Sequence, residues 1–426
     1  MIKQLYSKKN KHMNLRVGFV GLSHLGLNYL AAAAEKNFKT IGFDMNSKLI
    51  SKLNKFDVPL SEPYLEKNLR KNKNLISFSD DFSLIKKCDI VFISQDVKTN
   101  KNGTGKLEDI KFLINYTKKF IKKETILVIL SQIQPKFMKN IKFDKTRLFY
   151  QVETLVFGRA VERALYPERI IIGCYNKNIP IKKKYLVYLK KFKCPLIKMK
   201  YESAELTKIA INTFLTSSIT TTNVLSEICN RVSADWSEIK PAIMLDERIG
   251  KKAYLNPGLG ISGGNLERDI SSLKKLIKSD KNLKLLTDSF EKNSKYMKSW
   301  VYRILKKRKL LNNSKNSFSI LGVSYKENTN SIKNSPSIEL IQSLKGKNLR
   351  VYDPKAVLQY KQRNCIQFKS IDQALLKSKI LILMVPWKEF KNIKVKKNIK
   401  LIIDPFRILK NKNIPKKKIE YYSLGK

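Results

Sequence analysis

A short apolar strand that runs into a glycine turn and then a helix is the feature that most constrains the fold of this chain. The strand spans 15–20, the turn is Gly21-Leu-Ser-His-Leu-Gly26, and an uninterrupted helix is predicted through 27–34. A second apolar strand at 40–43 ends at Asp44. This order is typical of a βαβ unit that binds a dinucleotide, with phosphate at the helix N-terminus and the acidic residue at a ribose hydroxyl.

The predicted cofactor-binding residues are Gly21, Ser23, Gly26 and Asp44. Ser23 stands where the pattern has its second glycine, so the glycine spacing alone is weak evidence. The preceding strand and the acidic residue after the second strand strengthen it. Because a carboxylate repels a 2′-phosphate, Asp44 favours NAD over NADP as the cofactor.

The alternation of strands and helices continues along the chain and then restarts. Apolar segments at 88–93 and 125–130 indicate further parallel strands in the first half. Beyond a basic, polar stretch at 306–316, strands are predicted at 317–322, 349–353, 379–385 and 401–404, with a helix at 337–344. A dehydrogenase needs one nucleotide pocket for its cofactor, so a second such unit suggests that the other substrate is also nucleotide-linked.

Between the two halves lies a long helix followed by a glycine-rich loop. Apolar residues recur at helical spacing from Ala204, and no Gly or Pro interrupts the segment through Arg231. Lys208 and Asn212 are four residues apart and therefore share one helix face. Glycines in the loop at 256–269 let backbone N–H groups approach a phosphate or a substrate. A buried structural helix and an ordinary tight loop would show the same pattern.

These observations predict an α/β protein with two Rossmann-like parallel-sheet domains joined by a long central helix. The predicted limits are a basic tail at 1–13, an NAD-binding domain at 14–200, a central helical region for dimerisation and the active site at 201–305, a linker at 306–316, and a C-terminal nucleotide-sugar-binding domain at 317–426.

The net charge of 86 − 35 = +51 is of the kind that nucleic-acid-binding proteins carry. The lysines, however, are spread through every segment, and no finger or RNP-type motif occurs. A compositional bias towards Lys, Asn and Ile explains the charge better, so nucleic acid is not the expected partner. The charge still favours an anionic substrate.

The five cysteines are scattered without a CxxC pair, which indicates a reducing, cytoplasmic location and disfavours a cysteine-based zinc site. No metal is expected. His12 and His24 are the only histidines, so a histidine general base is nearly excluded. No apolar run reaches the ~18 residues of a transmembrane helix, and the basic tail lacks the apolar centre of a signal peptide. No membrane association is expected.

A set of motifs follows in a fixed order. They are Gly21-x-x-x-x-Gly26 with Asp44, Pro59-Leu-Ser-Glu-Pro63, Glu153, Pro167-Glu-Arg169, Glu205-x-x-Lys208-x-x-x-Asn212, Asp246-Glu-Arg-Ile-Gly250, Gly258-x-Gly260 with Gly263 and Arg268-Asp269, Tyr325-Lys326 with Asn334-Ser-Pro336, Val351-Tyr-Asp-Pro354 and Trp387-Lys-Glu-Phe390. Together they resemble the UDP-glucose/GDP-mannose dehydrogenase family, the nucleotide-sugar 6-dehydrogenases, from about Leu15 to the C-terminus.

The resemblance implies NAD-dependent oxidation of the C6 hydroxyl of a nucleotide sugar, for polysaccharide precursor synthesis. Such a reaction needs a base, a group that stabilises the developing alkoxide, and a hydride acceptor. Lys208 matches the family lysine that stabilises oxyanions, and Asn212 matches the asparagine that works with it. Glu153 matches a glutamate implicated in acid–base work, and Asp269 is carried over as a further catalytic residue.

The resemblance also implies the substrate contacts and a partner. Arg248 matches an arginine that reaches the nucleotide sugar, often from a neighbouring subunit. Lys326 matches a lysine that contacts the substrate from the C-terminal domain, and Gly260 and Lys333 complete the expected substrate-binding set. A homodimer with the long helix at its interface is expected. For each charged residue, a surface or interface ion pair is the alternative interpretation.

Three positions depart from the family pattern. Asn265 aligns with the cysteine that forms a thiohemiacetal in the second oxidation, and an amide cannot form that adduct. Val97 aligns with a threonine whose hydroxyl positions water, and Thr99 is close by but offset. Lys333 replaces an arginine, which keeps the charge but loses the bidentate fork.

Three classes of function therefore stay open. The first is a nucleotide-sugar dehydrogenase with an altered second step, through the aldehyde hydrate. The second is an NAD oxidoreductase that stops after two electrons. The third is a non-catalytic nucleotide-sugar-binding homologue or a nucleic-acid-associated protein. The combination of Lys208, Asn212 and Glu153 favours the first, since a pure binder does not need it.

Asp44 generates a prediction about cofactor choice. NAD should be preferred over NADP by at least about tenfold, or 1.4 kcal/mol, because the carboxylate repels a 2′-phosphate. Steady-state kinetics with each cofactor measure the ratio, and Asp44→Ala should weaken NAD binding without unfolding the chain. Equal use of the two cofactors would contradict the assignment of Asp44 as the ribose ligand.

Overall fold

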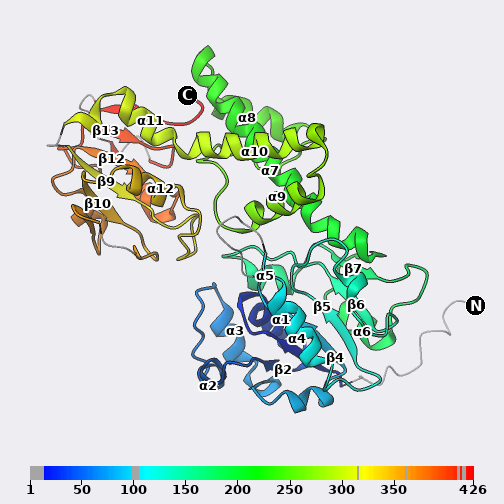
Figure 1. The fold of residues 1–426 in the computed structure, drawn as a ribbon. Coiled ribbons are helices and arrows are strands. Elements are labelled where there is room, and N and C mark those ends of the chain that lie inside the picture. Colours follow the sequence, from blue (N-terminus) through cyan, green and yellow to red (C-terminus); the bar gives the residue numbers. More distant parts are fainter. Residues whose placement is uncertain (1–13, 98–104, 314–315, 360–361, 410–412, 415–418) are drawn as a thin grey trace, which may run out of the picture. The chain divides into compact units, whose positions relative to one another are not determined.

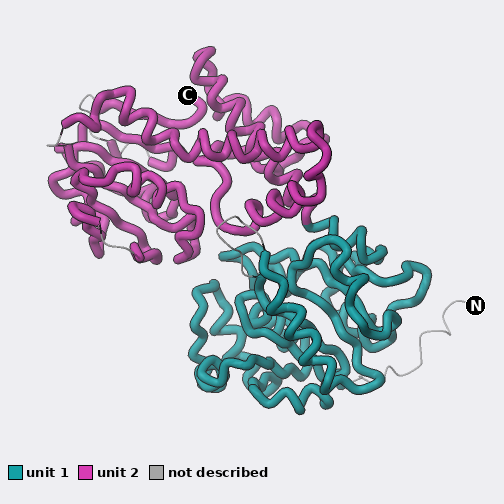
Figure 2. The backbone as a smooth tube through the Cα atoms, viewed as in Figure 1, with its two compact units in different colours: residues 1–100, 105–208 teal, residues 101–104, 209–426 magenta. Residues whose placement is uncertain are grey.

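Two compact units make up the structure, a computed structural model that describes residues 14–97, 105–313, 316–359, 362–409, 413–414 and 419–426 (Figures 1 and 2). The first unit ends at Lys208 and the second begins at Ile209, so the division falls within one helix. No helix in the described ranges combines the length and the hydropathy needed to cross a membrane.

The first unit is built on an eight-stranded sheet with the order β3-β2-β1-β4-β5-β6-β7-β8. Its strands are β1 (Arg16–Val20), β2 (Lys39–Phe43), β3 (Ile76–Ser79), β4 (Ile90–Ile93), β5 (Ile126–Ile129), β6 (Leu148–Gln151), β7 (Ile170–Cys174) and β8 (Leu196–Lys200). All neighbours are parallel except β6 and β7, which are antiparallel. The first six strands have the order of a dinucleotide-binding sheet.

Helices cover this sheet and bury its central strands. They are α1 (His24–Glu35), α2 (Ser47–Asn54), α3 (Leu65–Lys71), α4 (Glu108–Thr117), α5 (Ala160–Leu165) and α6 (Lys183–Lys190), with the 3₁₀ turns η1 (Lys73–Leu75), η2 (Phe82–Lys87) and η3 (Met138–Asn140). Every residue of β4 and β5 is buried, as expected for parallel strands covered on both faces. Tyr185 and Tyr188 of α6 pack their rings against Phe92 of β4.

The second unit contains a six-stranded, fully parallel sheet with the order β11-β10-β9-β12-β13-β14. Its strands are β9 (Ser317–Leu321), β10 (Asn348–Tyr352), β11 (Cys365–Gln367), β12 (Ile380–Leu383), β13 (Leu401–Ile403) and β14 (Glu420–Tyr422), accompanied by α12 (Pro336–Ser343), α13 (Ile371–Leu375) and η5 (Lys388–Asn392). Read in chain order, this sheet repeats the arrangement of the first six strands of the other unit.

The repetition extends to the turn after the first strand. The Gly21 N–H donates to the Phe43 carbonyl and the Gly322 N–H to the Tyr352 carbonyl, each at 2.8 Å. The two glycines have φ values of +91° and +96°, a left-handed conformation that favours glycine. The same turn therefore connects β1 to its helix and β9 to the segment that follows it.

The second unit also contains most of a helical region. Its helices are α7 (Tyr201–Val232), α8 (Trp236–Leu245), α9 (Asn265–Leu276), α10 (Lys281–Lys298) and α11 (Trp300–Lys307), with the 3₁₀ turn η4 (Leu310–Asn312). The end of the chain binds the turn between α7 and α8: the Gly425 carbonyl accepts from the Trp236 N–H at 2.9 Å, and Arg407 pairs with Asp235 at 2.5 Å. These contacts attach the helical region to the second sheet.

The predicted fold class is confirmed: two parallel-sheet α/β domains are present, with a central helix of 32 residues. The segment predicted as a linker begins inside α11, and Leu310 and Leu311 of η4 pack against the core of the second sheet. The domain limits at 14, 200, 305 and 316 stay predictions.

Candidate functional site

The glycine turn at the start of α1 has the backbone geometry of a phosphate site. A side chain at Gly26 would place its Cβ 2.1 Å from the Gly21 carbonyl oxygen, and one at Gly21 would lie 2.7 Å from Gln95. Both positions therefore require glycine, and the helix N-terminus that follows attracts an anion. This turn fits the diphosphate of a dinucleotide.

Asp44 is available to a ligand, whereas its counterpart in the second sheet is not. The Asp44 carboxylate accepts only from the N–H groups of Leu22 and Asn46, each at 2.9 Å, and it is partly exposed. The Asp353 carboxylate, at the end of β10, is buried and accepts from four backbone N–H groups and an indole N–H, those of Val323, Ser324, Lys355, Ala356 and Trp387. Asp44 can thus hold a ribose hydroxyl, and Asp353 is a structural residue.

Lys208 and Glu153 form a buried ion pair in the first unit. The Lys208 Nζ lies 2.9 Å from Glu153 Oε1, and both side chains are about nine-tenths buried. The Leu155 N–H donates to the other Glu153 oxygen at 3.0 Å, which fixes the carboxylate in the loop after β6. A buried charge pair of this kind needs both partners, since one charge alone would be strongly destabilising.

Glu205, three residues before Lys208 on α7, anchors this end of the helix. Its carboxylate is fully buried and accepts from the N–H groups of Lys136 and Met138, each at 2.7 Å. Burial raises the pKa of Glu205, and these backbone hydrogen bonds oppose that rise. The contacts hold the first turns of α7 against the segment after β5.

Asn212 and Asp269 form the corresponding contact in the second unit. Asn212, one helical turn beyond Lys208 on α7, donates from Nδ2 to the Asp269 carboxylate of α9, and both residues are buried. The Asp269 carboxylate also lies 3.9 Å from the Arg268 guanidinium. An amide donor and a buried carboxylate are thus held together at the start of α9.

The glycine loop before α9 is fixed on two sides within the second unit. A side chain at Gly260, where φ is +79°, would meet the Ser294 carbonyl of α10 at 2.5 Å. A side chain at Gly263 would meet the Tyr325 ring at 2.7 Å, and the Gly263 N–H donates to the Lys333 carbonyl at 3.2 Å. The loop therefore has no room for larger residues at these positions.

Asn265 is the first residue of α9 and directly follows this loop. Its Oδ1 accepts from the Arg268 guanidinium at 3.4 Å. The Lys333 ammonium lies over the loop, 2.9 Å from the position that a Cβ of Gly264 would take. Burial and the nearby Arg268 lower the pKa of Lys333. Asn265, Arg268 and Lys333 thus surround the end of the loop.

The remaining predicted substrate contacts lie apart from these groups. Lys326 places its ammonium over the neighbouring Tyr325 ring at 5.7 Å. Arg248 is exposed and forms a bidentate contact with Asp246 at 3.0 and 2.6 Å. The structure does not bring Arg248 to any other predicted site residue in the described ranges. Val97 is buried, and Thr99 lies outside the described residues.

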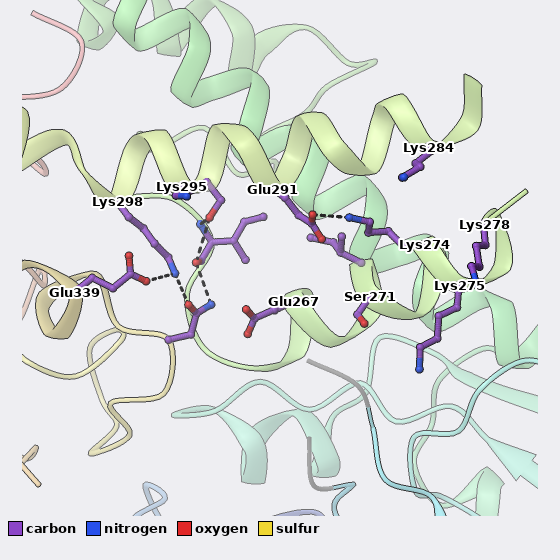
Figure 3. Close-up of a pocket in the computed structure, with 14 residues that line it drawn as sticks. Glu267, Ser271, Lys274, Lys275, Lys278, Lys284, Glu291, Lys295, Lys298 and Glu339 are labelled. Atoms are coloured by element: carbon purple, nitrogen blue, oxygen red, sulfur yellow. Dashed lines mark hydrogen bonds and ion pairs between the residues drawn. The ribbon is translucent and has the colours of Figure 1, made fainter. Parts of the chain in front are cut away.

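A cavity of about 760 Å³ lies between α9 and α10, on the other face of α9 from Asp269 (Figure 3). Its lysines include Lys274, which pairs with Glu291 at 2.6 Å, and Lys298, which pairs with Glu339 at 2.6 Å. Glu267 points into it, and burial raises the pKa of that carboxyl. Positions 265 and 269 are four apart and share one face, whereas 267 faces away from it. The largest cavity is therefore separate from the Asn212–Asp269 contact.

Three models of one family match successive parts of the chain. They are the NAD binding domain of the UDP-glucose/GDP-mannose dehydrogenase family at 15–189, its central domain at 202–295 and its UDP binding domain at 319–411. The chain belongs to the UDP-glucose/GDP-mannose dehydrogenase family. This membership confirms NAD as the cofactor and a nucleotide sugar as the class of substrate.

Relatives span the whole chain. The chain is 28% identical to the UDP-glucose 6-dehydrogenase of Rickettsia prowazekii, over 96% of this chain and 99% of that protein. A UDP-glucose dehydrogenase from Pyrobaculum islandicum has a similar structure, with a TM-score of 0.86, 21% identity, and 98% and 99% of the two chains covered. The UDP-D-ManNAc dehydrogenase of Pyrococcus horikoshii has a TM-score of 0.80 at 19% identity, with 96% and 99% covered. At these identities the structures show a shared fold.

Sequence reasoning gave no role to three charged residues. Glu205 had a local signal, because it interrupts the apolar face of a predicted helix. Asp96 had one too, because it follows a buried strand. Glu62 had none: it bonds His24, 38 residues away, at 2.8 Å. Burial opposes ionisation of Glu62, but hydrogen bonds from His24 and from two backbone N–H groups outweigh it and lower its pKa.

The cysteines generate a prediction about thiol reagents. Burial raises the pKa of Cys88 to about 12 and also raises the pKa values of Cys174, Cys194 and Cys365, so these thiols stay protonated and unreactive near neutral pH. Treatment of the native enzyme with iodoacetamide should leave alcohol oxidation essentially intact. Labelling in urea, where all five cysteines react, is the control. Loss of activity with one labelled active-site cysteine would show that Asn265 is misplaced in the alignment.

Proposed function

We propose that this chain oxidises the C6 hydroxyl of a nucleotide sugar with NAD in the cytoplasm, and that it does so without a cysteine nucleophile, for polysaccharide precursor synthesis. The observation that supports this most is the pair of buried polar contacts made from α7, Lys208 with Glu153 and Asn212 with Asp269. A protein that only bound nucleotide sugars would have no use for two buried ionisable contacts at this cost.

The first oxidation assigns a task to each partner of the ion pair. Glu153 accepts the proton of the C6 hydroxyl, and the Lys208 ammonium stabilises the alkoxide that develops. Asn212, one turn further along α7, donates a second hydrogen bond to the same oxygen. NAD, when bound, accepts the hydride from C6. The products are the aldehyde, NADH and one proton.

The second oxidation needs a route that avoids a thiohemiacetal, since Asn265 offers no thiolate. Addition of water to the aldehyde gives a hydrate, and loss of a proton and a hydride from that hydrate gives the carboxylic acid. Asp269 is the base proposed for this water, because the Asn212 amide holds its carboxylate in a buried position. Lys208 stabilises the hydrate oxygen as it did the alkoxide.

A two-electron enzyme is the second candidate, and the replacement of the thiol by the Asn265 amide favours it. Such an enzyme would release the aldehyde after one hydride transfer. A non-catalytic binder is the third candidate, and the Lys208–Glu153 pair argues against it. The sugars to test include UDP-glucose and UDP-N-acetylmannosamine, because relatives of this chain are named for them.

Variants of Lys208 and Asn265 separate these candidates. Lys208→Ala should lower the first oxidation by about two orders of magnitude or more, through loss of the oxyanion contact. Because it also leaves Glu153 buried and unpaired, the double variant Lys208→Ala/Glu153→Gln should regain thermal stability and stay inactive. Lys200→Ala, at an exposed lysine that ends β8, is the matched control.

The second oxidation is followed by the number of NADH molecules formed per nucleotide sugar. Wild type should give two if the hydrate route operates and one if the enzyme stops at the aldehyde. Asn265→Cys should move a value below two upwards. A wild type that forms no NADH with any sugar of a UDP and GDP panel, and stays inactive as Asn265→Cys, would contradict the proposed function.

The chain is further proposed to form a homodimer through α7 and α8. Apolar side chains are exposed on both helices, among them Phe214 at 82% and Leu245 at 72%. Leu225, Ile228 and Val232 continue the exposed stripe on α7 at helical spacing. Side chains of this kind usually indicate a contact with another protein chain.

Light scattering at micromolar concentration should therefore give twice the mass of 49.4 kDa. Leu225→Lys combined with Ile228→Lys should shift the protein to the monomer, because it buries two charges in the interface. Leu285→Lys, at an equally exposed leucine of α10, should not. A stable monomer for wild type would contradict the proposed interface.

A further inference from the structure

The segment after β4 folds back onto the start of α1. The Asp96 carboxylate accepts from the Leu25 N–H in the first turn of α1, with Oδ2 at 3.1 Å. The Asp96 N–H donates in turn to Ser23 Oγ at 2.8 Å. Ser23 is the N-cap residue of α1, but its side chain makes no cap hydrogen bond within the helix. Asp96 therefore caps a helix whose own N-cap side chain is used elsewhere.

This contact places a negative charge where a phosphate would bind. The free N–H groups and the dipole at a helix N-terminus attract an anion. Gly21 and Gly26 shape the turn for a close approach to this end of the helix, and Asp44 lies at its other side for a ribose. The Asp96 carboxylate and a cofactor diphosphate both require the Leu25 N–H, and their charges repel.

We propose that Asp96 competes with the NAD diphosphate for the N-terminus of α1, so that it lowers the affinity for the cofactor and turns away when the cofactor binds. The inference rests on NAD binding by this unit and deepens the proposed function, but it needs no assumption about the sugar.

The surrounding contacts limit the motion to the Asp96 side chain. Ser94, two residues earlier, donates from Oγ to the carbonyls of Val20 and Gly21 at 3.1 and 3.0 Å, and the Gln95 carbonyl accepts from Ser131 Oγ at 2.7 Å. The backbone before Asp96 is thus held. The Asp96 side chain itself is exposed, so rotation into water leaves its charge solvated. Displacement then costs little more than one helix cap.

The test compares NAD binding by calorimetry in wild type and in Asp96→Asn, without any nucleotide sugar. The asparagine keeps an acceptor for the Leu25 N–H but removes the charge. The Kd for NAD should fall by about tenfold at low ionic strength, and the difference should shrink in salt as screening removes the repulsion. Asp96→Glu, which restores the charge, should return the Kd towards the wild-type value.

Two controls make the outcome decisive. Asp57→Asn removes the charge of another exposed aspartate in the same unit and should leave the Kd unchanged. ADP-ribose, which keeps the diphosphate but lacks nicotinamide, should show the same gain as NAD. Ser23→Gly, which removes the acceptor of the Asp96 N–H, provides a second route to tighter binding.

An unchanged or weaker Kd in a folded Asp96→Asn variant, checked by its thermal denaturation, would overturn the proposal. A gain with NAD but none with ADP-ribose would also overturn it, because Asp96 would then act at the nicotinamide end. Because binding is measured with no sugar present, an absence of sugar oxidation would affect the proposed function and leave this inference standing.

Discussion

The buried polar face of α7 is the constraint on which the arrangement of this protein depends. Glu205, Lys208 and Asn212 lie within about two turns of that helix, and each is at least nine-tenths buried. Charged groups taken out of water must be paired or they destabilise the fold. The helix therefore determines which segments lie beside it: Glu205 binds the segment after β5, and Lys208 binds the loop after β6. Asn212 binds the start of α9.

A repeated backbone turn has been adapted to two purposes. In both sheets a left-handed glycine follows the first strand and an aspartate follows the second. In the first sheet Asp44 keeps exposed lone pairs and helix α1 begins at once, so the turn can receive a ligand. In the second sheet five donors saturate Asp353, and the turn is structural. The fold is shared, and the hydrogen bonding of one carboxylate distinguishes the two turns.

The sequence predicted well what local patterns encode. Buried parallel strands such as β1 and β4 are continuous apolar runs, and α7 has uninterrupted helical periodicity, so both could be recognised. The short strands β8, β11 and β14 were missed, because mixed or very short segments acquire strand structure only by pairing with a neighbour. Lys208 and Asn212 were predicted from their spacing and their motif.

The partners of those residues were beyond local patterns. The contact of Asp96 with Leu25 joins positions 71 residues apart, and only the folded sheet brings them together. The central claim is that the α7 contacts perform a C6 oxidation. It is tested most directly with nucleotide sugars that carry two deuterium atoms at C6, followed by mass spectrometry of cofactor and sugar. The account predicts deuterium in the NADH and a product oxidised at C6. Reduced cofactor without deuterium, or bound sugars that are never oxidised, would contradict it.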